Sequence, residues 1–208
     1  MRVVVFGAGG GVGRRVVAAG AAQGHEVVAA ARSSSEVPSG ASAAAIDVRD
    51  ADALNRVVVG ADALLWCVGV TKRSGPDVGR TAMPLLVKAA QQAGVSRLVS
   101  VSGAGITLPE DAKGAGARFV SALTRRLARD LVLDKEGEHE ALAASALAWT
   151  EVRPPRLSDT EPTGRWALVD QAPGLTAKPV AKADVALAML ALAGSGDWIR
   201  RSPFLVAG

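Results

Sequence analysis

Short apolar runs alternate along the chain with longer segments in which apolar residues recur at helical spacing. The apolar runs predict strands at residues 3–6, 27–31, 44–46, 63–67, 98–101 and 149–152. Most of these runs are apolar throughout, which indicates strands that are covered on both faces. The longer segments predict helices at residues 12–23, 50–58, 78–93 and 118–144. Strands that alternate with helices in this way predict an α/β fold with a doubly wound parallel sheet.

Glycine and aspartate residues mark several of the predicted helix ends. Gly24 and Gly94 follow the first and third helices, where a left-handed residue commonly ends a helix and glycine adopts that conformation without strain. Asp50 and Asp77 precede the second and third helices. We expect both aspartates to act as N-caps, accepting hydrogen bonds from the free N–H groups of the first turn.

The pattern changes after residue 153, because prolines and glycines interrupt residues 154–180 repeatedly. We expect this stretch to be a loop-rich segment at the edge of the sheet, on the side where substrates dock. A last helix over 183–193 and a last strand over 204–206 follow. Residues 1–208 are thereby predicted to form a single domain, since the chain length matches about one domain.

Composition narrows the class of protein. Of 208 residues, 49% are hydrophobic and 21% are charged, which excludes a disordered chain. No apolar run reaches the roughly 18 residues of a membrane span, so no membrane partner is expected. The net charge of +4 comes from basic residues that are scattered, apart from clusters at Arg125, Arg126 and Arg129 and at Arg200 and Arg201. Aromatic residues are not interleaved with them, which argues against nucleic-acid binding. A single cysteine, Cys67, excludes an internal disulfide and favours a cytoplasmic location.

A glycine-rich turn follows the first predicted strand and opens the first helix. Its residues are Gly7, Ala8, Gly9, Gly10, Gly11, Val12 and Gly13. The spacing G-x-x-G-x-x-G fits this segment, whereas G-x-G-x-x-G fails because Val12 takes its last position. Free N–H groups at a helix N-terminus bind pyrophosphate, and glycines let the phosphates approach the backbone. In this strand–turn–helix context we predict a dinucleotide site rather than a purely structural turn.

The end of the second strand indicates which dinucleotide binds. An NAD site usually has an acidic residue there, and this chain has none. Arg32 can instead pair with a 2′-phosphate, and the hydroxyls of Ser33 and Ser34 can add hydrogen bonds. The alternative is that Arg32 is a solvated loop residue. We predict NADP as the cofactor, with NADPH preferred over NADH.

Several segments besides the glycine turn match a known family. They are Gly24-His25-Glu26-Val27, Ile46-Asp47-Val48-Arg49-Asp50, the strand at 97–102, the Arg-Pro-Pro block within 145–159, and residues 183–186. The chain resembles the atypical short-chain dehydrogenase/reductases. In particular it resembles the NAD(P)H-binding group that includes biliverdin reductase B, a flavin reductase, and the NmrA-like proteins.

The resemblance implies a Rossmann-like fold that binds NADP at the C-terminal ends of the strands. It implies that residues 7–13 hold the pyrophosphate and Arg32 the 2′-phosphate. The other positions it implies are Asp47 and Val48 at the adenine, Cys67, Val68 and Gly69 at the ribose and nicotinamide, and Ser102, Pro154, Pro155 and Arg156 beside the nicotinamide. Cys67 is read as a small hydrophobic filler rather than a nucleophile.

The chain departs from the family at its proton donor. Short-chain dehydrogenases pair a tyrosine with a lysine four residues later; the lysine falls on Lys135 and the tyrosine on Leu131. The chain contains no tyrosine, which argues against alcohol–ketone chemistry. Lys135 either binds the nicotinamide ribose or is solvated among Asp134, Glu136 and Glu138. His139, one helical turn later, is either an acid or base or a structural residue.

Conjugated acceptors remain accessible to such a site, because a flavin or quinone accepts hydride and can take its proton from solvent. The favoured function is therefore an NADPH-dependent reductase of flavins, quinones or similar small-molecule acceptors. Arg156 either attracts an anionic group of the substrate or pairs with Asp159 or Asp184. The alternatives are a non-catalytic NADP sensor with a protein partner, as in NmrA-like proteins, and an epimerase or dehydratase.

No metal site is expected, because the chain has two histidines and one cysteine. The stretch at 118–144 is long enough for either a dimer face or a lid, so both a monomer and a homodimer stay open.

Overall fold

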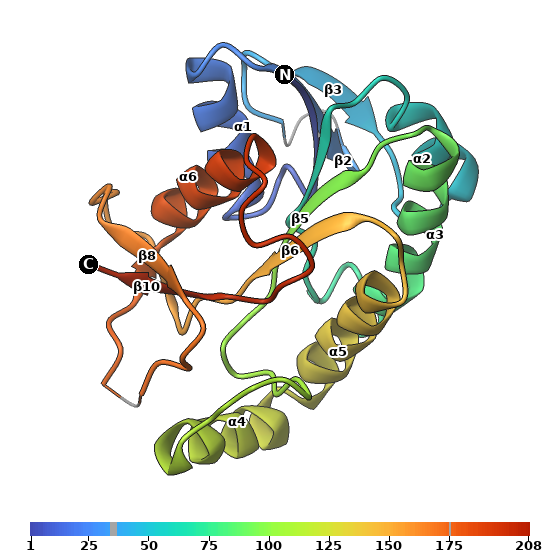
Figure 1. Cartoon of the computed structure of the whole chain (residues 1–208). Helices are drawn as coiled ribbons and strands as arrows, with labels where there is room; N and C mark the ends of the chain where they lie inside the picture. The colour runs from blue at the N-terminus through green and yellow to red at the C-terminus, as the bar shows by residue number, and fades with distance from the viewer. Residues whose placement is uncertain (34–36, 175) are drawn as a thin grey trace.

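The computed structural model describes residues 1–33, 37–174 and 176–208. Its centre is a six-stranded parallel sheet with the order β3-β2-β1-β4-β5-β6 (Figure 1). The strands are β1 (Arg2–Phe6), β2 (Glu26–Ala31), β3 (Ser42–Ala45), β4 (Ala63–Trp66), β5 (Arg97–Val101) and β6 (Ala148–Val152). All six strands predicted from the sequence are present. The third begins and ends earlier than expected, because Ala45 is the last residue that pairs with β2.

Helices cover both faces of this sheet. They are α1 (Gly13–Ala22), α2 (Ala51–Val57), α3 (Val78–Gln92), α4 (Ala115–Leu127), α5 (Arg129–Ala143) and α6 (Lys182–Ala193). Along β1, Val3 and Val5 pack towards α1 and α6, whereas Val4 and Phe6 pack towards α2 and α3. The α/β fold with a doubly wound, Rossmann-like sheet is therefore confirmed.

The stretch at 118–144, expected as one helix, forms two. Ala128 separates α4 from α5 with φ −133° and ψ 47°, outside the helical region. Figure 1 shows α4 at the edge of the molecule, beyond the end of α5 and away from the sheet.

The structure shows which of the predicted residues end or cap the helices. Gly24 and Gly94 have φ of 77° and 71°, so both left-handed glycines are confirmed. Asp50 is confirmed as an N-cap, since its side chain accepts from the backbone of residues 52 and 53. The expectation for Asp77 is wrong: its carboxylate pairs with Arg49 and makes no cap hydrogen bond.

The C-terminal part adds two small sheets beside the main one. The segment at 154–180, expected to be loop-rich, contains β7 (Leu157–Ser158) and β8 (Trp166–Val169) and leads into β9 (Val180–Ala181). β8 pairs antiparallel with β10 (Phe204–Ala207), and β7 pairs with β9. These short strands hold the segment against the carboxyl end of the sheet.

Candidate functional site

The glycine turn leaves β1 at the point where the sheet order changes direction, which is where α/β folds bind ligands. Gly7 has a φ of 74°, and a Cβ atom there would lie 2.7 Å from the carbonyl oxygen of Cys67. A Cβ atom on Gly13 would lie 2.8 Å from the carbonyl carbon of Gly7. Side chains at these two positions would collide with backbone, so glycine is required both where the turn approaches the end of β4 and where it folds back on itself.

A cavity of about 170 Å³ lies against this turn, and we name it the glycine-turn cavity. Of the predicted cofactor residues, it is lined by Gly7, Gly9, Gly10, Arg32, Asp47, Val48, Cys67, Val68 and Gly69. Ala8, Gly11, Val12, Gly13 and Ser33 do not line it. The side chains of Ala8 and Val12 are buried in the core instead. Ser34 lies outside the described residues.

A loop after β4, which the sequence analysis missed, closes the glycine-turn cavity. Thr71, Arg73 and Ser74 line the cavity, and Arg32 Nη1 donates a hydrogen bond to the carbonyl oxygen of Arg73 at 2.6 Å. This contact holds the Arg32 guanidinium at the cavity. The signal in the sequence was the basic, turn-forming stretch that follows β4.

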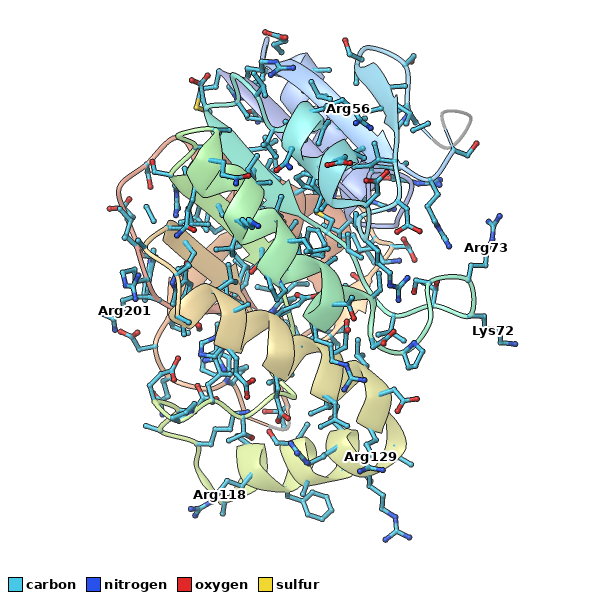
Figure 2. All side chains as sticks on the ribbon, turned by 90° about the vertical axis from the view of Figure 1, so that its right-hand side faces the viewer. Arg56, Lys72, Arg73, Arg118, Arg129 and Arg201 are labelled. Atoms are coloured by element: carbon cyan, nitrogen blue, oxygen red, sulfur yellow. The ribbon has the colours of Figure 1, made fainter. Side chains whose placement is uncertain are left out.

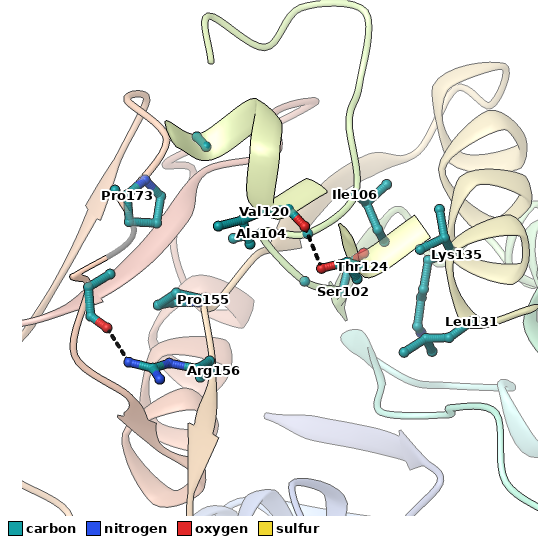
Figure 3. Close-up of a pocket in the computed structure, with 16 residues that line it drawn as sticks. Ser102, Ala104, Ile106, Val120, Thr124, Leu131, Lys135, Pro155, Arg156 and Pro173 are labelled. Carbon is teal, nitrogen blue, oxygen red and sulfur yellow. Dashed lines mark hydrogen bonds between the residues drawn. The ribbon is translucent and has the colours of Figure 1, made fainter. Parts of the chain in front are cut away.

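A second, larger cavity of about 380 Å³ has a largely apolar lining, and we name it the apolar cavity (Figure 3). It lies between the segment after β5, helices α4 and α5, and the loop-rich C-terminal segment. Its lining includes Ser102, Ile106, Val120, Leu131, Lys135, Pro155, Arg156 and Pro173. Four of these, Ser102, Lys135, Pro155 and Arg156, are predicted site residues. Pro154 is buried and does not line the cavity; its carbonyl oxygen accepts from the Ala104 N–H.

Lys135 joins the two cavities. Its Nζ donates to the carbonyl oxygen of Val68 at 2.8 Å, and Val68 lines the glycine-turn cavity. The same Nζ contacts both carboxylate oxygens of Glu138, at 2.9 and 2.8 Å. Both side chains are buried, so the alternative of a solvated lysine is wrong. Burial raises the pKa of Glu138 to about 7, against the opposing effect of Lys135.

Leu131 lies one helical turn before Lys135 and lines the same apolar cavity (Figure 3). The position that carries the family's phenol therefore faces the cavity and presents a hydrocarbon side chain. Ser102 also lines the cavity, and its hydroxyl is buried without a hydrogen-bond partner among the described residues. A buried polar group of this kind is expected to find a partner in a bound ligand.

The Cys67 side chain turns towards the core rather than towards a reacting centre. Its Sγ lies 3.9 Å from Met189 Sδ on α6. Burial raises the pKa of the thiol to about 12, and the attraction of Lys135 lowers it only in part. These properties agree with the interpretation of Cys67 as a packing residue.

His139 does not join Lys135 at the apolar cavity. It lines a different cavity, and its Nδ1 lies 2.9 Å from Glu151 Oε2 while its ring packs edge-on against Trp149. Burial lowers the pKa of His139, but the hydrogen bond and charge of Glu151 and the charge of Glu110 outweigh this, so the pKa is raised. The candidate role as acid or base beside Lys135 is therefore wrong, because β6 and the loop before α4 enclose the ring.

Arg156 makes neither of the expected ion pairs. Its Nη2 donates to the carbonyl oxygen of Ala177 at 2.9 Å (Figure 3). Asp159 pairs with Arg15 and Lys182 instead, and the Asp184 carboxylate accepts from the Thr163 and Gly164 backbone. The guanidinium is exposed at the rim of the apolar cavity, where it remains a candidate for an anionic group of a ligand.

The described part of the chain holds neither a membrane-spanning helix nor a metal-binding cluster. None of its helices has the length and hydrophobicity needed to cross a membrane. Outside residues 34–36 and 175, no group of three histidine, cysteine or acidic side chains is arranged to hold a metal ion.

Comparisons with known proteins agree with this geometry. A family model described as NAD(P)H-binding matches residues 7–195. No curated protein matches the sequence. The fold is similar to the oxidoreductase ylbE from Lactococcus lactis, with a TM-score of 0.82 and 23% identity over 100% of this chain and 91% of that one.

Two further solved structures are similar. ChuY, an anaerobillin reductase from Escherichia coli O157:H7, has a TM-score of 0.82 and 24% identity, over 100% of this chain and 97% of its own. A wide-type short-chain dehydrogenase/reductase from Veillonella parvula DSM 2008, in complex with NADP, has a TM-score of 0.80 and 16% identity, over 99% and 94%. At these identities the likeness establishes the fold.

Proposed function

Because this chain belongs to the NAD(P)H-binding family, we propose that it is a cytoplasmic NADPH-dependent reductase of the atypical short-chain dehydrogenase/reductase kind. Its acceptor is a flavin, a quinone or a similar conjugated molecule. When bound, the nicotinamide supplies the hydride. The observation that carries the proposal is the apolar cavity, which adjoins the glycine-turn cavity through Lys135 and presents Leu131 where the family has its phenol.

The residues that would hold the nucleotide follow from the glycine-turn cavity. The N–H groups of Gly7 and Ala8 donate to the carbonyl oxygen of Ala30, and that of Gly10 donates to the carbonyl oxygen of Gly7, so a pyrophosphate would be bound by the other N–H groups of the turn at the start of α1. Arg32 is held at the other end by the carbonyl oxygen of Arg73, where its guanidinium can pair with a 2′-phosphate. Asp47 and Val48 lie next to it on the adenine side. Ser102 offers, on the nicotinamide side, a hydroxyl that has no hydrogen-bond partner in the described part of the chain.

The chemistry of the apolar cavity suits acceptors that need no proton from the protein at the moment of hydride transfer. Among the described residues that line it, only Lys135 and Arg156 ionise, and neither Leu131 nor any aliphatic neighbour donates a proton. The apolar walls orient a flat acceptor and exclude water from the reacting face. Arg156 at the rim attracts an anionic substituent of the acceptor.

The test has a binding step and a turnover step. NADPH and NADH are titrated against the intrinsic fluorescence of the four tryptophans, and FMN, a quinone and a bilin are then added to the NADPH complex. We expect acceptor-dependent oxidation followed by absorbance. Tight NADPH binding without oxidation by any acceptor would contradict the reductase.

Arg32→Ala tests the cofactor preference separately. We expect the Kd for NADPH to rise about 10- to 100-fold and the Kd for NADH to stay within about twofold, since only NADPH carries the 2′-phosphate. Arg56→Ala, an exposed arginine at the end of α2, is the matched control and should change neither Kd. An unchanged NADPH-to-NADH ratio in Arg32→Ala would show that the assignment of NADP is wrong.

One observation favours a second candidate, a non-catalytic NADP sensor. Lys135 Nζ is engaged by Glu138 and Val68, which suits a residue that holds a nucleotide in place rather than one that moves protons. A sensor would bind NADPH and NADP with different affinities, and it would neither oxidise the cofactor nor reduce an acceptor. The same titration, repeated with NADP, separates the two candidates.

A further inference from the structure

Helix α4 exposes three large apolar side chains to solvent. Phe119, Leu123 and Leu127 are 65%, 46% and 76% exposed, and we name them the α4 stripe. A spacing of four residues places them along one side of the helix. Exposed apolar residues are ordinary when they are scattered, but three in a row on one helix indicate a contact surface.

Arginines accompany the α4 stripe. Residues 115–131 contain four arginines and one acidic residue, Asp130. Arg125 pairs with Glu136, whereas no ion pair of the described residues involves Arg118, Arg126 or Arg129. At 100° per residue, Arg126 borders the stripe and Arg118 lies further round the same polar side. Figure 2 shows Arg118 and Arg129 pointing outwards from this end of the molecule.

The side of α4 next to the stripe lines the apolar cavity. Ala117, Val120 and Thr124 face the cavity. On the helix surface, Val120 lies between the stripe and the other two residues. Because α4 packs on α5 and lies beyond the sheet, the stripe sits at the periphery of the molecule beside the cavity (Figure 1).

The positive charge of this surface indicates which class of partner it binds. A second copy would bring the same arginines face to face, at an electrostatic cost. A nucleic acid would neutralise the arginines but leave Phe119 and the two leucines in water. The surface of an anionic bilayer accommodates both, because apolar side chains enter the acyl boundary while arginines contact the headgroups.

We propose that α4 docks this protein on the surface of an anionic phospholipid bilayer, with the α4 stripe inserted and Arg118, Arg126 and Arg129 at the headgroups. The expectation of no membrane partner rested on the length of apolar runs, which excludes a span but not a helix that lies in the interface. One consequence rests on the proposed function: a lipid-soluble quinone in the bilayer would lie beside the apolar cavity.

Co-sedimentation with vesicles tests the docking on lipid. The experiment needs neither cofactor nor acceptor, so a negative result would leave the proposed reductase activity untouched. The full chain is mixed with vesicles of phosphatidylcholine, or of phosphatidylcholine and phosphatidylglycerol, at low and high salt. We expect binding to the mixed vesicles only, weakened by salt. Absence of sedimentation, or equal sedimentation with both vesicles, would overturn the proposal.

A pair of matched double variants identifies the surface. Phe119→Ser with Arg126→Gln should lower the partition onto mixed vesicles about a hundredfold, from the loss of one inserted ring and one headgroup contact. Val59→Ser with Arg56→Gln removes an equally exposed side chain and the same charge near α2, on the opposite end of the molecule (Figure 2), and should bind as the unmodified chain does.

Equal losses in the two double variants would overturn the assignment to α4. Thermal unfolding of both variants checks that each is folded. Analytical ultracentrifugation without vesicles tests whether a second copy of the chain binds the α4 stripe instead. A dimer that dissociates in the variant Phe119→Ser with Arg126→Gln would assign the stripe to a second copy and overturn docking on lipid.

Discussion

A Cβ atom on Gly79 would lie 2.6 Å from Cδ of Glu138 and 2.7 Å from Oδ2 of Asp134. Gly79, in the first turn of α3, leaves the space in which these two buried carboxylates of α5 sit. Asp134 Oδ1 uses that space to accept from the backbone N–H groups of Gly79 and Arg80, at 2.8 and 3.0 Å. The N-terminus of α3 is thus capped from α5, and the missing side chain of Gly79 leaves room for Glu138, which pairs with Lys135.

Gly79→Ala should therefore destabilise the fold. The methyl group would displace Glu138 and disturb its buried ion pair with Lys135, at a cost of about 3 kcal/mol. Gly20→Ala is the control, since a Cβ there meets two flexible side chains, Val27 Cγ2 at 3.1 Å and Leu190 Cδ2 at 3.5 Å, and gains helix propensity. Urea unfolding measures both variants. Equal stability of the two would contradict the tight α3–α5 contact.

Glu138→Gln should alter how stability depends on pH. An unfolded glutamate has a pKa near 4.5, and burial raises that of Glu138 to about 7. The folded state then binds this proton more tightly, so the contribution of Glu138 to the unfolding free energy decreases as pH rises from 4.5 to 7. Denaturation across this range should show a flatter profile for Glu138→Gln. Glu140→Gln, an exposed change on the same helix, should leave the slope unchanged.

Cys67 should react slowly with iodoacetamide. Its pKa of about 12 leaves roughly a thousandfold less thiolate at pH 8 than the ordinary value of 9.0 would give. Labelling followed by mass spectrometry should be slow in the native protein and fast in urea, and absent in Cys67→Ala. A native rate equal to the rate in urea would indicate an activated nucleophile instead.

Leu131→Tyr tests whether the missing phenol decides the substrate, and it rests on the proposed function. The new phenol would face the apolar cavity one turn before Lys135. We expect reduction of quinones to change little, and reduction of simple ketones to rise about 10²-fold, the usual effect of a positioned acid. Leu131→Phe, which adds the ring without the hydroxyl, should leave ketone reduction at the unmodified level. A similar rise in both variants would mean that shape, not proton donation, limits the reaction.

Local patterns in the sequence predicted most of the fold. The mostly apolar runs predicted the six parallel strands, because the strands inside such a sheet are covered on both faces. The one-residue break at Ala128 was not predicted, since no proline or glycine marks it. The N-cap of α3 was assigned to Asp77, the nearest acidic residue in sequence. The cap comes from Asp134 instead, a residue 55 positions from Gly79 that only packing brings into reach.

The sequence by itself determined the glycine turn, the absence of an acid after β2, and the spacing of four residues that puts Leu131 and Lys135 at one cavity. Each of these depends on neighbours in the chain or on one helical turn. Tertiary structure alone decided that Lys135 pairs with Glu138, and that His139, one turn further on, faces a different cavity. It decided the partners of Arg156 as well. The physical reason is that a helix periodicity fixes which residues share a face, while the segments packed against that face determine what each side chain meets.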